Sequence, residues 1–294
     1  MPSVSVTKRL TLAGLSATLT AACSPLSMFA TLSPKDPASV LGRSEAYGPH
    51  PRQGLDVYAP PKSVLAAANG EAPLAVFFYG GSWDSGRRQD YNWVGRALAS
   101  RGFVTVVADY RLYPEVKYPD FLADSAQAVR WASDNAARFG ADPGRIVLVG
   151  HSAGAYNAAM LALDGRYLKA AGVDPSRVKA LAGLSGPYDF LPLQGDITHR
   201  IFGDTADLPA TQPMAYVRKD SAPAFLATGD SDREVWPKNT VALAKAYRAA
   251  GAEVDERHYA GVDHAGMVLA LSRPLRGRAP VLDEMTGFLR RHTG

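Results

Sequence analysis

Short apolar runs alternate with amphipathic stretches along most of the chain. The apolar runs are nearly continuous and are bounded by Gly, Pro or Asp, a pattern typical of strands buried on both faces. We expect such strands at residues 72–79, 103–108, 145–149, 178–184 and 224–228, an earlier edge strand at 54–58 and a late strand at 253–259. Helical patterns lie at about 91–100, 119–139, 153–163, 236–250 and 279–291. This alternation predicts an α/β fold, with a doubly wound, mainly parallel sheet and helices on both faces.

The domain organisation is simple. The 294-residue chain is 47% hydrophobic, which is enough for one large core. We find no internal repeat and no second domain boundary, and we predict a single domain over residues 52–294. Residues 187–223 form the longest stretch without clear periodicity, so we expect them to pass over the ligand end of the sheet.

The first 22 residues are typical of a secretory signal. Lys8 and Arg9 precede a short apolar run that ends at Ala22. Cys23 follows at the position that becomes lipidated in a bacterial lipoprotein signal, so it is a candidate lipid attachment site. Residues 23–51 are rich in Pro, Ser and Gly and are predicted to be a tether. The alternatives are an ordinary cleaved signal and a cytosolic protein with an Ala/Thr-rich tail.

Composition excludes several classes of protein. Cys23 is the single cysteine, so an intramolecular disulfide and a cysteine-based metal site are excluded. The net charge of +4 is too weak to indicate a nucleic-acid partner. No Gly-x-Gly-x-x-Gly or Gly-Lys-Ser/Thr loop follows a predicted strand, which argues against nucleotide binding.

A Gly-x-Ser-x-Gly motif over residues 150–154 joins the strand at 145–149 to the helix at 153–163. This context presents a serine hydroxyl in a strained turn, beside a helix N-terminus that favours a developing negative charge. Larger side chains in place of Gly150 and Gly154 would meet neighbouring backbone. Ser152 is therefore the candidate nucleophile, and the alternative is a plain turn that contains a serine.

A nucleophilic serine needs a base, and the base needs an orienting carboxylate. After a serine in this type of turn, the acid comes before the histidine along the chain. Asp230 and Asp232 follow the strand at 224–228, and His264 follows the last strand. His258 is the rival base, but it lies within the predicted strand. We favour His264, and at this point both aspartates stay open as the acid.

The strand at 72–79 ends in a glycine pair, where backbone N–H groups can turn toward a developing oxyanion. We predict Gly81, Ser82 and Ala153 as the backbone donors of an oxyanion hole. The alternative for residues 80–82 is a tight structural turn. Trp83 either forms a wall of the pocket or packs the loop.

In combination, these motifs resemble the carboxylesterase branch of the alpha/beta hydrolases. The resemblance is carried by Tyr-Gly-Gly-Ser-Trp at 79–83, Asp-Tyr-Arg-Leu-Tyr-Pro-Glu at 109–115, the serine motif, Gly-x-x-Asp-x-x-Val at 229–235 and His264, and it runs from about residue 55 to 289. The most similar groups are the hormone-sensitive-lipase-like esterases, the kynurenine-formamidase-like enzymes and the feruloyl and acetyl xylan esterases.

The resemblance implies the alpha/beta hydrolase fold and ester hydrolysis through an acyl-enzyme, with no metal or organic cofactor. In that family the acid lies three residues after the glycine, which selects Asp232 over Asp230. The Asp-Tyr-Arg segment is usually a structural brace for the serine turn. The chain departs from the family at Tyr79, where the oxyanion motif usually begins with His.

We therefore predict a serine carboxylic ester hydrolase for short-chain esters, with Ser152, Asp232 and His264 as its catalytic triad. The alternatives are an arylformamidase or amidase of the same fold and a non-catalytic binding member. The expected partner is a small-molecule ester, with no nucleic-acid or protein partner. The expected location is outside the cytoplasm, as a periplasmic or lipid-anchored protein or otherwise as a secreted one.

Overall fold

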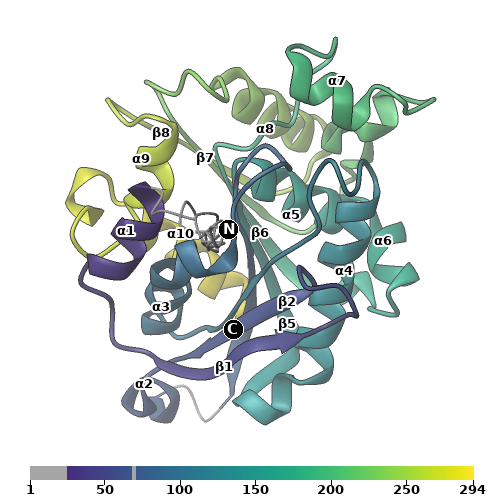
Figure 1. Ribbon diagram of the computed structural model, residues 1–294. Helices are drawn as coiled ribbons and strands as arrows, with labels where there is room; N and C mark the ends of the chain where they lie inside the picture. The colour runs from purple at the N-terminus through teal and green to yellow at the C-terminus, as the bar shows by residue number, and fades with distance from the viewer. Residues whose placement is uncertain (1–24, 68–70) are drawn as a thin grey trace, which may run out of the picture.

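The computed structural model describes residues 25–67 and 71–294 and arranges them around an eight-stranded sheet (Figure 1). The strands are β1 (Ser39–Ala46), β2 (Gly54–Ala59), β3 (Ala72–Phe78), β4 (Val104–Ala108), β5 (Ala141–His151), β6 (Val178–Leu184), β7 (Ala224–Gly229) and β8 (Val254–Tyr259). The α-helices are α1 (Pro25–Leu32), α2 (Lys62–Ala67), α3 (Asn92–Ser100), α4 (Asp120–Asp134), α5 (Ala153–Leu163), α6 (Gly165–Ala170), α7 (Asp196–Phe202), α8 (Lys238–Ala250), α9 (His264–Leu269) and α10 (Val281–Thr293). Short 3₁₀ helices cover Arg88–Tyr91, Ala136–Phe139, Pro175–Arg177, Pro209–Thr211, Pro213–Tyr216 and Arg276–Arg278.

The strands run in the order β1-β2-β4-β3-β5-β6-β7-β8. The pairs β1–β2 and β2–β4 are antiparallel, and all other neighbouring pairs are parallel. The predicted mainly parallel α/β sheet is confirmed. The expected edge strand at residues 54–58 is wrong in its position, because β2 pairs with β4 on one side and with β1 on the other.

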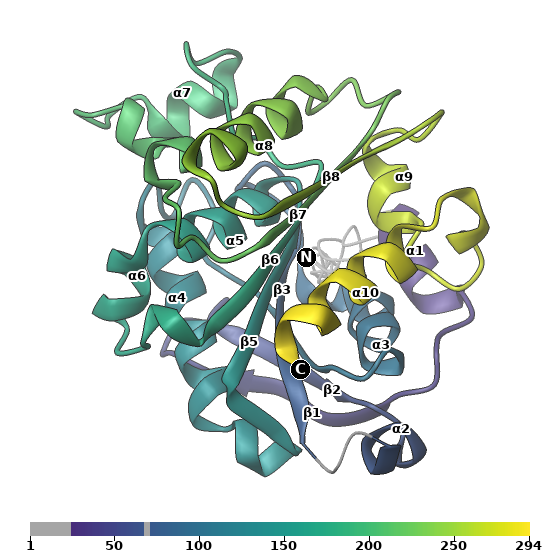
Figure 2. The same ribbon diagram turned by 180° about the vertical axis from the view of Figure 1, so that it is seen from behind.

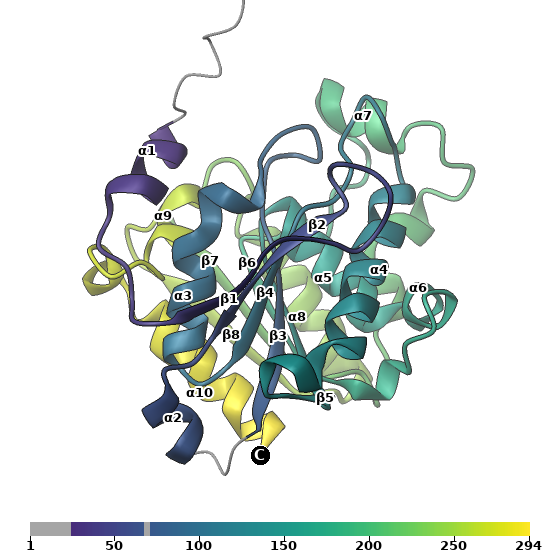
Figure 3. The ribbon, with the colours of Figure 1, turned by 60° about the horizontal axis from the view of Figure 1, so that its bottom comes forward.

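Helices cover both faces of the sheet. Figures 2 and 3 show α3 and α10 on one face and α4, α5 and α8 on the other. Every residue of β3, β4 and β7 is buried, which explains their continuous apolar sequences. In a sheet of this kind, ligands bind outside the carboxyl ends of the parallel strands.

Residues 25–51 differ from the predicted tether. Residues 25–32 form α1, and residues 39–46 form β1, which pairs with β2 at the edge of the sheet. Register shifts between Val40 and Gly42 and between Gly42 and Glu45 break the period-two pattern of β1, so the sequence carried no strand signal there. The predicted signal segment 1–22 and Cys23 lie outside the described residues.

Residues 187–223 contain α7 and two 3₁₀ turns rather than a bare loop. Together with α8 they lie at the end of the sheet where the central strands finish (Figure 1). In the described ranges, every helix is too short or too polar to cross a membrane.

Candidate active site

Ser152 lies in the sharp turn between β5 and α5. β5 ends at His151 and α5 begins at Ala153, so Ser152 is the N-cap of the helix. Its backbone has φ 55° and ψ −127°, a conformation that a residue with a side chain rarely adopts. This turn directs the hydroxyl away from the sheet at the carboxyl end of a central strand, as the sequence motif predicts.

Two glycines make this turn possible. A Cβ atom added at Gly150 would overlap the carbonyl group of Gly154, and one added at Gly154 would overlap the carbonyl group of Phe78. Backbone cannot yield to such a contact without moving the strand. The glycine positions of the motif therefore follow from the close approach of α5 to the ends of β3 and β5.

Ser152, His264 and Asp232 form a hydrogen-bonded chain. Ser152 Oγ lies 2.9 Å from His264 Nε2, and His264 Nδ1 lies 2.8 Å from Asp232 Oδ2. His264 is the first residue of α9, and Asp232 follows β7 with none of its surface exposed. With the carboxylate ionised, Nδ1 donates to Asp232 and the free lone pair of Nε2 can accept the serine proton.

Asp232 is held as a carboxylate. Its Oδ1 accepts hydrogen bonds from the backbone amides of Glu234 and Val235, at 3.0 and 2.9 Å. Burial raises the pKa of Asp232, but the hydrogen bond and charge of His264 and the amide of Val235 outweigh it and leave the pKa below its usual value. The acid therefore stays ionised at neutral pH.

The alternative acid and base, Asp230 and His258, lie outside the triad. The side chain of Asp230 is 54% exposed, and its Oδ1 is 3.7 Å from His258 Nδ1. His258 Nε2 lies 2.8 Å from Glu256 Oε1 on the same strand. The structure thus brings together the triad favoured from sequence and places Asp230 and His258 in a separate cluster at the surface.

The predicted oxyanion donors adjoin the nucleophile. Gly81 and Ser82 have positive φ values of 133° and 50°, and a Cβ atom on Gly80 would lie 2.7 Å from Ser152 Cβ. Ala153 is the first residue of α5. Within residues 25–67 and 71–294, the amides of Gly81, Ser82 and Ala153 donate no hydrogen bond to protein, so they are available to a ligand.

Tyr79 occupies the position where the related family usually has histidine. Its ring is buried and stacks between Tyr91 and Tyr110, with centroids 5.4 and 5.0 Å away. The hydroxyl of Tyr110 donates to the carbonyl oxygen of Tyr79 at 2.8 Å. Aromatic packing and this hydrogen bond hold the start of the loop at residues 79–83.

The segment Asp109-Tyr110-Arg111 braces the oxyanion loop and α4. Asp109 forms a buried ion pair with Arg88, whose backbone amide also donates to Asp109 Oδ1 at 2.7 Å. Arg111 donates to Asp124 of α4 at 2.8 Å. These contacts differ from the expected brace for the serine turn, since Tyr110 acts on residue 79 instead.

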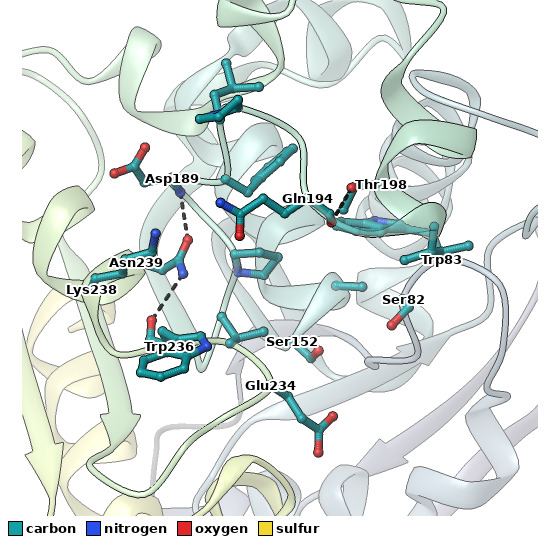
Figure 4. Close-up of a pocket in the computed structure, with 17 residues that line it drawn as sticks. Ser82, Trp83, Ser152, Asp189, Gln194, Thr198, Glu234, Trp236, Lys238 and Asn239 are labelled. Atoms are coloured by element: carbon teal, nitrogen blue, oxygen red, sulfur yellow. Dashed lines mark hydrogen bonds between the residues drawn. The ribbon is translucent and has the colours of Figure 1, made fainter.

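Trp83 has both of the roles considered from sequence. It is buried against Phe121, Tyr156 and Phe202, and its indole N–H donates to Asn157 at 3.0 Å. It also lines a cavity of about 310 Å³ beside Ser152, which we call the loop pocket. The pocket is bounded by residues 187–198 and 234–239 (Figure 4).

A second cavity lies beside the same serine. It has a volume of about 510 Å³ and is bounded by α1, residues 80–82, Tyr91 and α9, and we call it the α1 chamber. Ser82, Ser152 and Glu234 line both cavities. The nucleophile therefore stands between two spaces of different construction.

No group of three or more His, Cys, Asp or Glu side chains in the described part of the chain could hold a metal ion. His151, His258 and His264 each have a protein partner at hydrogen-bond distance. This arrangement is suited to acyl transfer, because it combines a serine hydroxyl, a hydrogen-bonded base and nearby backbone N–H groups without a protein acceptor among the described residues.

Comparison with known proteins agrees with this geometry. Residues 55–247 match the family BD-FAE. The chain is 32% identical to a probable isoprenylcysteine alpha-carbonyl methylesterase of Oryza sativa subsp. japonica, over 84% of this chain and 62% of that protein. It is 29% identical to esterase LipQ of Mycobacterium tuberculosis, over 83% of this chain and 60% of that protein. The chain thus spans less than two thirds of the length of these relatives.

Solved esterase structures share the fold. A truncated carbohydrate esterase from gut microbiota superposes with a TM-score of 0.75 at 21% identity, covering 89% of this chain and 99% of that one. A thermophilic esterase of Thermogutta terrifontis with bound propionate gives a TM-score of 0.69 at 26% identity, covering 86% and 94%.

Proposed function

The chain belongs to the BD-FAE family, within the carboxylesterase branch of the alpha/beta hydrolases, and we propose that it is a serine carboxylic ester hydrolase. The observation that carries the proposal is the continuous hydrogen-bonded chain from Ser152 through His264 to Asp232. The substrate class is a small-molecule ester, in line with the esterase names of the relatives.

The reaction begins at the serine. Ser152 Oγ attacks the ester carbonyl carbon while its proton passes to His264 Nε2, and the carbonyl π electrons move onto oxygen. Backbone N–H groups of Gly81, Ser82 and Ala153 stabilise that oxyanion. The C–O bond to the alcohol then breaks, and His264 returns the proton to the departing oxygen, which leaves an acyl-serine.

Water completes the cycle. His264 takes a proton from a water molecule that attacks the acyl carbon. When the second tetrahedral intermediate collapses, the bond from the acyl carbon to Ser152 Oγ breaks and His264 gives its proton to Oγ, which frees the acid and restores the hydroxyl. Asp232 keeps the proton of His264 on Nδ1 and stabilises the imidazolium formed in both halves of the reaction.

The test is Ser152→Ala, assayed on a 4-nitrophenyl ester of a short acid. We expect turnover to fall by several orders of magnitude, because the oxyanion donors and substrate binding alone give only a small fraction of the rate enhancement. Ser82→Ala is the matched control and should be mild, since only the backbone of Ser82 is used. A fluorophosphonate probe should add its mass to the peptide that contains Ser152.

Retention of most activity by Ser152→Ala would contradict the mechanism. A fully folded chain with no hydrolysis of any ester and no labelling by the probe would instead support a non-catalytic binding member of the fold. Preferential turnover of N-formyl aryl amides would favour an arylformamidase.

We propose further that the chain is exported and carries lipid on Cys23. The support is the order of features in the sequence, in which Lys8 and Arg9 precede an apolar run that ends directly before Cys23. Mass spectrometry of protein from a bacterial host should find Cys23 as a lipidated N-terminus. An unmodified Cys23, or an N-terminus elsewhere, would contradict this proposal without affecting the catalytic one.

A further inference from the structure

The two cavities beside Ser152 differ in their walls. The loop pocket has a mixed wall, in which polar side chains such as Gln194 and Asn239 stand among apolar ones such as Phe190 and Trp236. The α1 chamber is larger, and beyond the serine turn its wall is mainly apolar: Leu26 and Phe29 from α1, Val268 and Leu269 from α9, and Tyr91. Each cavity therefore suits a different part of a substrate.

α1 is fixed in place as a wall of this chamber. The ring of Phe29 meets that of Trp93 edge-on, with centroids 5.5 Å apart. Ser27 Oγ donates to Asp90 at 2.8 Å, and Asn92 Nδ2 donates to the carbonyl oxygen of Ala30 at 3.3 Å. On the outer side of the helix, Met28 is 49% exposed. The helix thus has an inner face toward the chamber and an outer face toward solvent.

The chemistry of the triad indicates which part of an ester each cavity would receive. His264 must give its proton to the departing alcohol oxygen, so the alcohol part of the ester lies on the side of the imidazole. His264 and the next residue, Ala265, line the α1 chamber, whereas the loop pocket, as built from the described residues, is lined by Ala153 and not by His264. This favours the α1 chamber for the alcohol and the loop pocket for the acyl group.

We propose that the α1 chamber binds an apolar alcohol moiety of the ester, and that α1 makes the enzyme selective for that moiety. The inference rests on the proposed function and deepens it. It predicts a substrate with a small or polar acyl group and a bulky apolar alcohol, held against Leu26, Phe29 and Leu269.

Two isomeric esters separate this assignment from plain hydrophobicity. Hexyl acetate and ethyl hexanoate have the same composition, but the first carries its long chain on the alcohol and the second on the acid. The measurement is the ratio of kcat/KM for hexyl acetate to that for ethyl hexanoate. This ratio does not depend on the concentration of active enzyme, so partial misfolding of a variant leaves it unchanged.

Leu26→Trp fills the chamber from α1, and Leu269→Trp fills it from α9. Burial of one methylene strengthens binding about fourfold. Exclusion of two or more methylenes of the hexyl alcohol from the chamber should therefore lower the kcat/KM ratio by at least about tenfold. Met28→Trp is the matched control, because it places the same side chain on the outer face of α1, and its ratio should stay within about twofold of the unmodified protein.

An unchanged ratio in both filled variants would overturn the assignment. So would a loss that falls on ethyl hexanoate, which would place the acyl chain in the α1 chamber. Both results leave hydrolysis itself intact. Absence of hydrolysis of either isomer by the unmodified protein, together with no effect of Ser152→Ala on aryl esters, would instead overturn the proposed function on which this inference rests.

Discussion

The Nε2 atom of His151 lies 3.0 Å from the backbone carbonyl oxygen of His264. A carbonyl oxygen only accepts, so Nε2 carries the proton and donates it. The residue next to the nucleophile therefore holds the backbone of the base, and the two imidazole rings lie 4.8 Å apart. His151 is a positioning residue that couples the serine turn to the start of α9.

Removal of this donor should lower kcat and leave KM nearly unchanged. His151→Phe keeps an aromatic ring but loses the N–H, and a lost hydrogen bond of about 1 kcal/mol corresponds to roughly five- to tenfold in rate. His151→Gln retains an N–H donor and should recover much of the loss. Steady-state kinetics on one ester decide between these outcomes, and a rise in KM at constant kcat would contradict the positioning role.

His151 should also make the fold sensitive to acid. Burial and the nearby charge of His264 lower the pKa of His151 to about 3, whereas an imidazole in an unfolded chain has a pKa of about 6.5. Between these values the unfolded chain binds one more proton than the folded chain. The free energy of unfolding should therefore decrease as the pH is lowered, by up to about 1.4 kcal/mol per pH unit from this group.

The measurement for this prediction is urea unfolding between about pH 7 and 5. His151→Phe removes the proton uptake, so its stability should fall less steeply with acidification than that of the unmodified protein. Equal slopes for the two proteins would show that His151 does not contribute to acid sensitivity.

The two candidate acids should behave very differently. Asp232→Asn should leave His264 in the wrong tautomer and lower turnover by about 10³–10⁴. Asp230→Asn is the control, because Asp230 pairs with His258 at the surface, and it should cost far less. His258→Ala should likewise be tolerated. Comparison of kcat/KM across these variants checks the assignment, and a large effect confined to the Asp230 variant would reverse it.

The enzyme should prefer esters with short acyl chains. The loop pocket has a volume of about 310 Å³ and includes polar residues such as Gln194 and Asn239. A methylene left outside a pocket contributes almost none of the roughly 0.8 kcal/mol that its burial would give. Among aryl esters of one phenol, kcat/KM should peak at about two to six acyl carbons. A steady rise to twelve or more carbons would show that a longer channel exists.

Local sequence predicts the central strands of the sheet well. The apolar runs of β3, β4 and β7 and the Gly-x-Ser-x-Gly turn follow from burial on both faces and from the close approach of α5. α1 and β1 lack such a local signal. The stability of α1 comes from contacts such as Phe29 with Trp93, far along the chain, and the pattern of β1 is interrupted at its bulges. Local sequence carries neither signal.

The candidate triad residues could be named from motif order, but their surroundings could not. His151 is the variable second position of the Gly-x-Ser-x-Gly motif, and nothing near it in the sequence indicates that its ring reaches residue 264. Tyr110 and Arg88 brace the oxyanion loop through contacts between segments separated by another strand or helix. The α1 chamber depends on α1 and α9, which come from opposite ends of the sequence.

The tight backbone around Gly150 and Gly154 has a consequence for how such a protein can change over evolution. Since a single added Cβ atom at either position would collide with main chain, the immediate setting of Ser152 has almost no freedom to vary. New selectivity must then arise in the surrounding walls, of which α1 and residues 187–198 lie at the periphery of the sheet. Directed evolution of this protein should concentrate random substitutions in those two segments and spare the serine turn.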